Sequence, residues 1–209
     1  MIQILVLDPH PIIHLGFKTI FTCQPKINLL PGIYKYKQLD PTLKNNSVDL
    51  LIMELDLLNG SPVSILKYIA SHHPNIKTII FSHQPVNVFA LSLLKAGAHG
   101  YLSKRTPSNL LIEAIQFVTN KGEKVISKHH NELEYKIKLN RPRNKYGELS
   151  PREIEILRHL IDGKRNITIA EELNISQKTV NTYKNRILEK LGTNNFHELF
   201  TQTKQFIPI

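Results

Sequence analysis

The chain has very little cysteine and no apolar stretch long enough to span a bilayer. Cys23 is the single cysteine among 209 residues, so no disulfide can form within the chain, and a buried thiol in a reducing compartment is its expected state. No apolar run approaches the roughly eighteen residues that a membrane-spanning helix requires. The first residues also lack the pattern of a secretory signal peptide. We therefore expect a cytoplasmic protein with no membrane partner.

The sequence also lacks the motifs on which most enzymes depend. It shows no nucleophile beside a base, no Gly-rich phosphate loop and no cluster of metal ligands. Four of its histidines form adjacent pairs, His72 with His73 and His129 with His130. Neighbouring residues on a helix do not converge on one ion, so these pairs do not indicate a metal site. We expect no enzymatic activity, no cofactor and no bound metal.

Acidic residues are scarce relative to basic ones. The chain carries 27 Lys and Arg against 17 Asp and Glu, a formal net charge of +10, which favours an acidic partner such as nucleic acid. The most densely basic segment is 121–148, where eight basic residues face four acidic ones. It has no helical periodicity and contains Pro142 and Gly147, so we predict a tether. Its charges either contact phosphates beside a bound domain or, as is commoner for such a run, are only solvated.

Residues 149–191 are predicted to form three helices. Ser150 is followed three residues later by Glu153, which is the spacing of a capping box at a helix start. Gly163 is placed to end that helix. A short helix over Ile167–Leu173 and a turn then lead to Ser176, whose hydroxyl can cap a third helix. This spacing is typical of a helix-turn-helix.

The third of these helices has one apolar and one polar side. At about 100° per residue, its apolar residues fall on one arc: Val180, Tyr183, Ile187, Leu188 and Leu191. The opposite arc is polar and suited to entering a DNA groove, and it carries Lys178, Thr179, Asn181, Thr182, Asn185 and Arg186. Lys184 falls within the apolar arc, so its stem should follow the packed edge while its ammonium extends outward to a phosphate.

The first 120 residues alternate strand-length apolar runs with helical patterns. Ile2–Leu7, Leu50–Met53 and Thr78–Phe81 are apolar on both faces, as buried parallel strands are. Shorter strands are predicted near Ile27–Leu30 and Gly100–Leu102. The series predicts a parallel sheet with helices on both faces. The helix between the second and third strands has no clear pattern and is placed only by elimination.

Polar side chains follow four of these predicted strands. Asp8, Glu54, Ser82 and Lys104 each come directly after a strand, or within two residues of its end. In an open parallel sheet the carboxyl ends of the strands meet at one edge, where functional groups gather. We therefore expect two acids, a hydroxyl and an ammonium in one crevice.

Two sets of motifs resemble the NarL/FixJ family of two-component response regulators. The crevice residues, with LDPHP near the start and LLKAGAHGYLSK near residue 100, resemble a receiver domain; LSPREIEIL, IAEELNIS and KTVNTYKNRILEKLG resemble the LuxR-type helix-turn-helix. The resemblance implies a flavodoxin-like α/β receiver over residues 1–120, with a five-stranded parallel sheet in the order 2-1-3-4-5. A basic linker over 121–147 and an all-α, four-helix LuxR-type domain over 148–209 would follow.

The fourth helix of that second domain is predicted from a separate pattern. Phe196, Leu199, Phe200 and Thr203 recur at helical spacing after Asn195. In the family this helix often forms the dimer contact. Apolar residues at this spacing equally suit a helix that covers the domain's own core.

The resemblance assigns roles to several crevice residues but also shows two departures. Ser82, Tyr101 and Lys104 match the family's switch hydroxyl, switch aromatic and phosphate-binding lysine. Pro9 stands where a second magnesium-binding acid is usual, and Glu54 stands at the phosphoacceptor aspartate. A hard cation thereby loses a carboxylate, and the longer Glu54 side chain displaces its oxygens from the in-line geometry that transfer needs. The receiver is therefore expected to be atypical.

Two hypotheses about the altered crevice remain open. In the first, Glu54 pairs with Lys104 and holds the receiver in a fixed, active-like state without phosphorylation. In the second, the site has decayed and these residues, with Asp8, only stabilise the fold. Asp56 is a disfavoured alternative phosphoacceptor, because strand alternation aims it away from Glu54 or into the following loop.

The leading functional hypothesis is a sequence-specific, DNA-binding transcription regulator that acts as a homodimer on the major groove of double-stranded DNA. By analogy with the family, Asn181, Thr182 and Asn185 would lie nearest the base edges. The phosphate contacts would come from Lys178, Thr179, Lys184 and Arg186. The alternative is an interaction protein that forms a heterodimer with another regulator and modulates it. The sequence leaves open whether a histidine kinase acts on the receiver.

Overall fold

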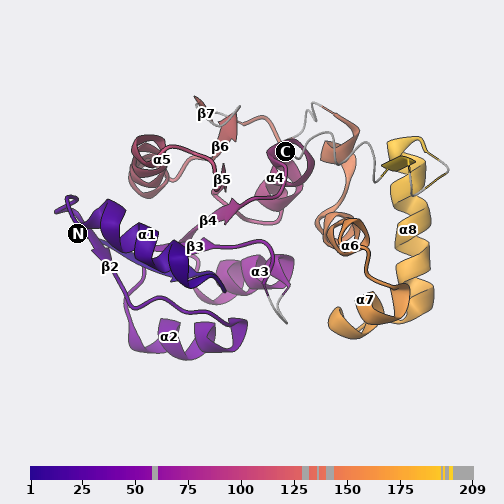
Figure 1. Ribbon diagram of the computed structural model, residues 1–209, viewed down its shortest axis with the longest axis horizontal. Coiled ribbons are helices and arrows are strands. Elements are labelled where there is room, and N and C mark those ends of the chain that lie inside the picture. Colours follow the sequence, from indigo (N-terminus) through magenta and orange to yellow (C-terminus); the bar gives the residue numbers. More distant parts are fainter. Residues whose placement is uncertain are drawn as a thin grey trace.

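The computed structural model describes residues 1–57, 61–128, 132–135, 137–139, 144–193, 195 and 198–199. An α/β unit is followed by a group of helices (Figure 1). The strands are β1 (Ile2–Leu7), β2 (Ile27–Leu29), β3 (Leu50–Met53), β4 (Lys77–Ser82), β5 (Gly100–Ser103), β6 (Val125–Lys128) and β7 (Glu132–Tyr135). The α-helices are α1 (Pro11–Phe21), α2 (Leu39–Asn45), α3 (Pro62–His72), α4 (Val86–Lys95), α5 (Ser108–Lys121), α6 (Pro151–Ile161), α7 (Asn166–Glu172) and α8 (Gln177–Leu191); short 3-10 turns occur at Tyr36–Gln38 and Lys145–Glu148.

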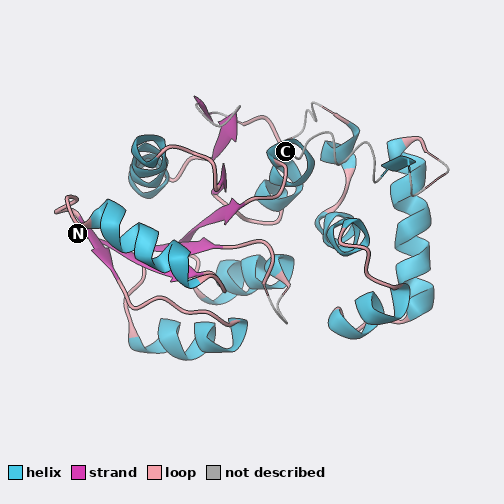
Figure 2. Ribbon diagram, viewed as in Figure 1, coloured by secondary structure: helices cyan, strands magenta, loops and turns pink. Residues whose placement is uncertain are grey.

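The sheet has the predicted core, with strands in the order β2-β1-β3-β4-β5 and all neighbours parallel. Figure 2 shows helices on both sides of it. Alternate residues of β1 face opposite sides: Ile4 and Val6 pack beneath α1 and α5, while Leu5 and Leu7 join the core under α2, α3 and α4. Burial on both faces explains why this strand is apolar at every position but one. The predicted fold class is thus confirmed.

The prediction of a tether over residues 121–148 is wrong in part, because two strands form within that segment. Val125–Lys128 forms β6, parallel to β5, and Glu132–Tyr135 forms β7, antiparallel to β6, so the sheet in the described residues has seven strands and not five. The edge of β5 offers unpaired backbone groups that another strand can satisfy. Val125 and Ser127 alternate inward along β6 and are buried. The ring of Tyr135 on β7 lies 4.3 Å from that of Phe117 on α5, so this hairpin belongs to the receiver.

The short β6 run was too brief to give a clear period of two in the sequence. Its neighbours are charged, and a four-residue strand buries only alternate side chains. Gly122 adopts φ +66° and ends α5 three residues before β6 begins. The strand forms because it pairs with the edge of β5, and no local sequence pattern reveals that edge.

The helix starts predicted near the carboxyl end are present. Ser150 accepts a hydrogen bond from the Glu153 backbone N–H, and Glu153 accepts one from the Ser150 N–H at 2.7 Å, which completes the capping box of α6. Ser176 accepts from the Thr179 N–H at the start of α8. Asn174, with φ +51°, makes the turn between α7 and α8. Of the predicted fourth helix only Glu198 and Leu199 are described, and both are helical; its other residues lie outside the described part.

The helical unit packs against the receiver through α6, which lies between α4 and α8 (Figure 1). Nine successive residues of α6, Glu153–Ile161, are buried. Ser92 of α4 donates a hydrogen bond to the Leu149 carbonyl at 2.7 Å, and Lys95 donates one to the Gly147 carbonyl at 2.8 Å. One apolar core therefore continues from the receiver into the helical unit.

One expectation from composition was wrong, because Cys23 is exposed. It lies in the turn that follows α1, where the chain leaves the core. In the described part of the chain, no helix combines the length and the apolar character needed to cross a membrane.

Candidate functional site

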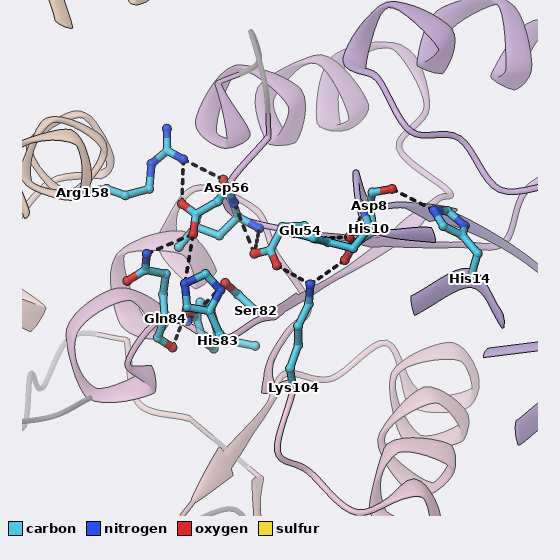
Figure 3. A network of polar contacts seen from close by, with 12 residues as sticks. Asp8, His10, His14, Glu54, Asp56, Ser82, His83, Gln84, Lys104 and Arg158 are labelled. Carbon is cyan, nitrogen blue, oxygen red and sulfur yellow. Dashed lines mark hydrogen bonds and ion pairs between the residues drawn. The ribbon is translucent and has the colours of Figure 1, made fainter. Parts of the chain in front are cut away.

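Two carboxylates and one ammonium meet at the carboxyl edge of the sheet (Figure 3). Asp8 follows β1 and Glu54 follows β3, and both are almost fully buried. The Nζ of Lys104, just after β5, lies 2.7 Å from Asp8 Oδ2 and 2.5 Å from Glu54 Oε2. Burial alone would lower the pKa of Lys104, but the hydrogen bonds to Asp8 and Glu54 outweigh it and raise that pKa. The ammonium is therefore held charged between the two acids.

The second oxygen of Glu54 is directed back onto its own loop. Glu54 Oε1 accepts hydrogen bonds from the backbone N–H of Leu55 at 2.6 Å and of Asp56 at 3.2 Å. Both oxygens are thus engaged, and the side chain as a whole is about 1% exposed. The Glu54 carboxylate organises the loop after β3 and does not point toward solvent.

A magnesium ion of the kind that receivers use does not fit this pocket. Pro9 supplies no side-chain ligand, and the Lys104 ammonium already contacts both acids. The other oxygen of Asp8 accepts from the backbone N–H and the Nδ1–H of His10, each at 2.8 Å. A hard cation would have to displace these donors.

Within the described part of the chain, two groups of metal-ligating residue types lie together that the sequence did not suggest. They are Asp8, His10 and Glu54, and Glu54, Asp56 and His83. In both groups the carboxylates are shared with a basic side chain, Lys104 or Arg158. The geometry therefore favours internal ion pairs over a bound metal.

The residues matched to the family's switch form a buried chain of hydrogen bonds. The Tyr101 hydroxyl donates to the Gln84 carbonyl at 3.0 Å, and the Gln84 N–H donates to Ser82 Oγ at 3.3 Å. Burial, and secondly the charge of Glu54, raises the pKa of Tyr101 well above its ordinary value, so the hydroxyl remains a donor. The Tyr101 ring is fully buried in an inward position.

Arg158 of α6 contacts the loop after β3, next to the pocket, and the sequence did not predict this contact. Arg158 Nη1 lies 2.8 Å from Asp56 Oδ1 and 3.1 Å from the Leu55 carbonyl (Figure 3). Gln84 Nε2 donates to the other Asp56 oxygen at 2.9 Å. Arg158 is only 4% exposed. In the sequence Arg158 is one of several charged residues in α6, and nothing there specifies its partner.

The polar side of α8 forms the second candidate surface. Val180, Ile187 and Leu191 are buried, as the helical wheel predicts. Among the predicted DNA contacts, five are exposed: Lys178, Asn181, Thr182, Asn185 and Arg186. Figure 1 shows α8 at the end of the molecule remote from the receiver sheet.

Two of the predicted contacts are less accessible than the other five. Thr179 is half-buried, with its hydroxyl 2.8 Å from that of Ser176, so it belongs to the helix cap as well as to the surface. Lys184 is half-buried, in keeping with a stem along the packed edge. Thr182 donates its hydroxyl hydrogen to the Lys178 carbonyl, which leaves its oxygen lone pairs and its methyl group for a partner.

A receiver-type sheet with an acidic pocket, followed by a helix-turn-helix, defines a DNA-binding response regulator of transcription. Residues 4–116 match the response regulator receiver domain, and residues 147–202 match the bacterial regulatory proteins of the luxR family. The chain therefore belongs to the response regulators with a LuxR-type domain, the NarL/FixJ family, as the motifs predict. This family comprises regulators and not enzymes.

Several relatives match along nearly the whole chain. The Fimbriae Z protein of Escherichia coli K12 is 28% identical, with 98% of this chain and 97% of the relative covered. The DNA-binding transcriptional activator EvgA of the same organism is 26% identical, with 94% and 95% covered. RcsB from Salmonella enterica serovar Typhimurium, solved bound to the promoter P1flhDC with the phosphomimetic BeF3⁻, superposes with a TM-score of 0.79 at 23% identity, covering 98% of each chain. This last likeness concerns the fold.

Proposed function

We propose that this DNA-binding transcription regulator operates without ordinary aspartyl phosphorylation. The observation that carries the proposal is the arrangement of Glu54, whose two oxygens are held by Lys104 and by its own loop. An incoming phosphoryl group needs an oxygen aligned with the leaving group and a cation to neutralise charge. Here the oxygens are turned inward, and Pro9 replaces one of the acids that would hold the cation.

In this proposal a permanent ion pair between Lys104 and Glu54 takes the place of phosphorylation. The Lys104 ammonium neutralises Glu54 and Asp8 together, and the inward Tyr101 ring is held by Gln84. The pocket then has one stable arrangement and no empty position that phosphorylation would fill. This is the arrangement that the fixed state requires, whereas in the decayed site the same contacts would only stabilise the fold.

The loop after β3 supplies the connection to the DNA-binding domain. Glu54 accepts from the Asp56 N–H, and the Asp56 side chain binds Arg158 of α6. The fixed pocket is therefore linked to α6 through two successive contacts. Control of DNA binding would then lie in the amount of protein, in dimerisation or in a partner.

Phosphorylation can be tested with labelled acetyl phosphate and magnesium. We expect no label on the wild type. The matched variant is the double substitution Pro9→Asp with Glu54→Asp, which restores both acids and should gain label if the rest of the pocket is intact. Incorporation into the wild type at the rate of that variant would refute the proposal.

The polar side of α8 is proposed to enter the major groove. Asn181, Thr182 and Asn185 would face base edges, because they are central and carry short hydrogen-bonding side chains. Lys178, Thr179, Lys184 and Arg186 would lie along the phosphates. The exposure of five of these seven residues on one side supports the assignment.

A homodimer is proposed as the DNA-binding form. One solved RcsB structure contains two RcsB dimers bound to two parallel DNAs, and a two-fold dimer would place two helices on half-sites about 34 Å apart. Light scattering on the free and DNA-bound protein tests this. A strict monomer in both states would instead favour the alternative, a regulator that pairs with another member of its class.

A further inference from the structure

An amide–amide hydrogen bond joins the first residue of α7 to the polar side of α8. Asn166 Nδ2 donates to Asn181 Oδ1 at 2.7 Å. Asn166 is half-buried, whereas Asn181 is exposed on the surface proposed to enter the groove. The inference drawn from this contact rests on the proposed function of α8.

The backbones on both sides of this bond are firmly placed. Ile169 and Ala170 anchor α7 in the core, and the Ile175 N–H donates to the Ala170 carbonyl at 2.9 Å, which fixes the turn between the helices. On α8, Val180 is fully buried beside Asn181. The two amides therefore meet without movement of either helix, and the bond restricts the rotation of the Asn181 side chain.

We infer that Asn166 is a positioning residue that makes Asn181 present its amide N–H groups, and not its oxygen, to the DNA. An asparagine amide has one acceptor oxygen and one donor nitrogen. With Oδ1 directed toward α7, Nδ2 is the edge that remains for a base. A freely rotating asparagine can instead bond adenine bidentately through both atoms.

The orientation has a direct consequence for the base that Asn181 contacts. In the major groove guanine offers two adjacent acceptors, N7 and O6, and thymine offers O4, whereas cytosine offers the N4 donor. An outward Nδ2 therefore fits guanine best and cytosine worst. Asn166 thus contributes to sequence preference without any need to touch the DNA itself.

The test compares base preferences of three full-length variants by selection from a random DNA pool. Asn166→Ala frees the Asn181 amide, so at one operator position the preference should move from guanine toward adenine, which a freely rotating asparagine bonds through both atoms. Asn166→Asp offers only acceptor atoms, so Asn181 must turn Nδ2 toward α7 and present Oδ1 outward. At that position the preference should then move toward adenine or cytosine, by roughly tenfold in relative affinity. Thr168→Ala, also near the start of α7, is the matched control and should leave the profile unchanged.

Relative preference among bases is the decisive quantity, because the added charge of Asn166→Asp also weakens binding to any DNA. Melting temperatures and affinities for random DNA identify a variant that is merely misfolded. If the wild type enriches a sequence and both Asn166 variants keep its profile at every position, the positioning role is wrong. If the wild type enriches no sequence at all, the proposed function itself fails.

Discussion

Arg158 of α6 and Asp56 of the loop after β3 form an ion pair across the contact between the receiver and the helical unit. The guanidinium nitrogen lies 2.8 Å from the carboxylate oxygen, and the two residues are 102 positions apart in the chain. Because the same guanidinium also donates to the Leu55 carbonyl, Arg158 links the end of a receiver strand to the first helix of the DNA-binding domain.

Removing this ion pair should loosen the contact between the two units. We expect Arg158→Ala to lower the free energy of unfolding by roughly 1.5–3 kcal/mol, the usual cost of losing hydrogen bonds to a charged group. Urea unfolding measures this cost, and small-angle scattering measures any separation of the units. Asp56→Asn, which keeps an acceptor oxygen, should have the smaller effect of the two. An unchanged unfolding curve for Arg158→Ala would show that the apolar core alone holds the contact.

The pair of Glu54 and Lys104 should show strong energetic coupling. We expect Glu54→Gln and Lys104→Met each to destabilise the receiver. The double variant should cost less than the two single variants together, by roughly 0.5–3 kcal/mol. The reason is that either single change leaves a buried charge without its partner. Additive effects in such a double-mutant cycle would indicate that the 2.5 Å contact contributes nothing.

His159 should lower the free energy of unfolding as the pH falls below about 6.5. Its Nε2 lies 3.1 Å from Arg158 Nη2, a donor, so the ring must be neutral there. Burial first, and the charges of Arg158 and Lys164 next, lower the pKa of His159 from 6.5 to about 3. The charge of Asp56 acts to raise this pKa, and the Glu172 carboxylate lies 3.3 Å from Nδ1 of the ring.

The direction of this effect follows from proton uptake. Between pH 6.5 and 3 the unfolded chain binds a proton at His159 that the folded protein does not bind. The free energy of unfolding therefore declines as the pH falls through that window, by at most about 1.4 kcal/mol per pH unit from this group. Urea unfolding at several pH values should show a steeper decline for the wild type than for His159→Gln. His99, whose pKa is also lowered, to about 4, contributes equally to both proteins. Parallel curves would mean that His159 is protonated without cost.

The exposed asparagine Asn185 should carry sequence information. Asn185→Ala is expected to cost about 1–3 kcal/mol on the selected operator and little on random DNA. Lys178→Ala serves as the comparison. It should weaken both kinds of binding alike and reduce the salt dependence by about one phosphate contact. Equal losses on operator and random DNA for Asn185→Ala would reject its contact with a base.

The sequence predicted the parts of the fold that depend on local patterns. The capping box of Ser150 and Glu153 formed as predicted, and the apolar arc from Val180 to Leu191 is the packed side of α8. The sequence also predicted that Glu54 and Lys104 share one crevice, because both follow strands whose carboxyl ends meet at one edge; their pairing was one of two open hypotheses, and the two side chains are in contact. Each of these depends on spacing or on a recurring topology.

Contacts between distant segments were beyond what the sequence could predict. The β6–β7 hairpin depends on the free edge of β5, and the bond of Arg158 to Asp56 depends on how two units dock. The bond between Asn166 and Asn181 depends on the angle between two helices. No periodicity or capping signal encodes such relationships, because they arise only when separate elements meet.

The β6–β7 hairpin limits how far the DNA-binding domain can travel. Only nine residues separate Tyr135 at the end of β7 from Lys145, where the next described turn begins. A chain of that length spans at most about 32 Å when fully extended, which is close to a single turn of B-DNA. While the hairpin remains paired with the sheet, the nine-residue connection thus sets the greatest distance that the DNA-binding domain can move from the receiver.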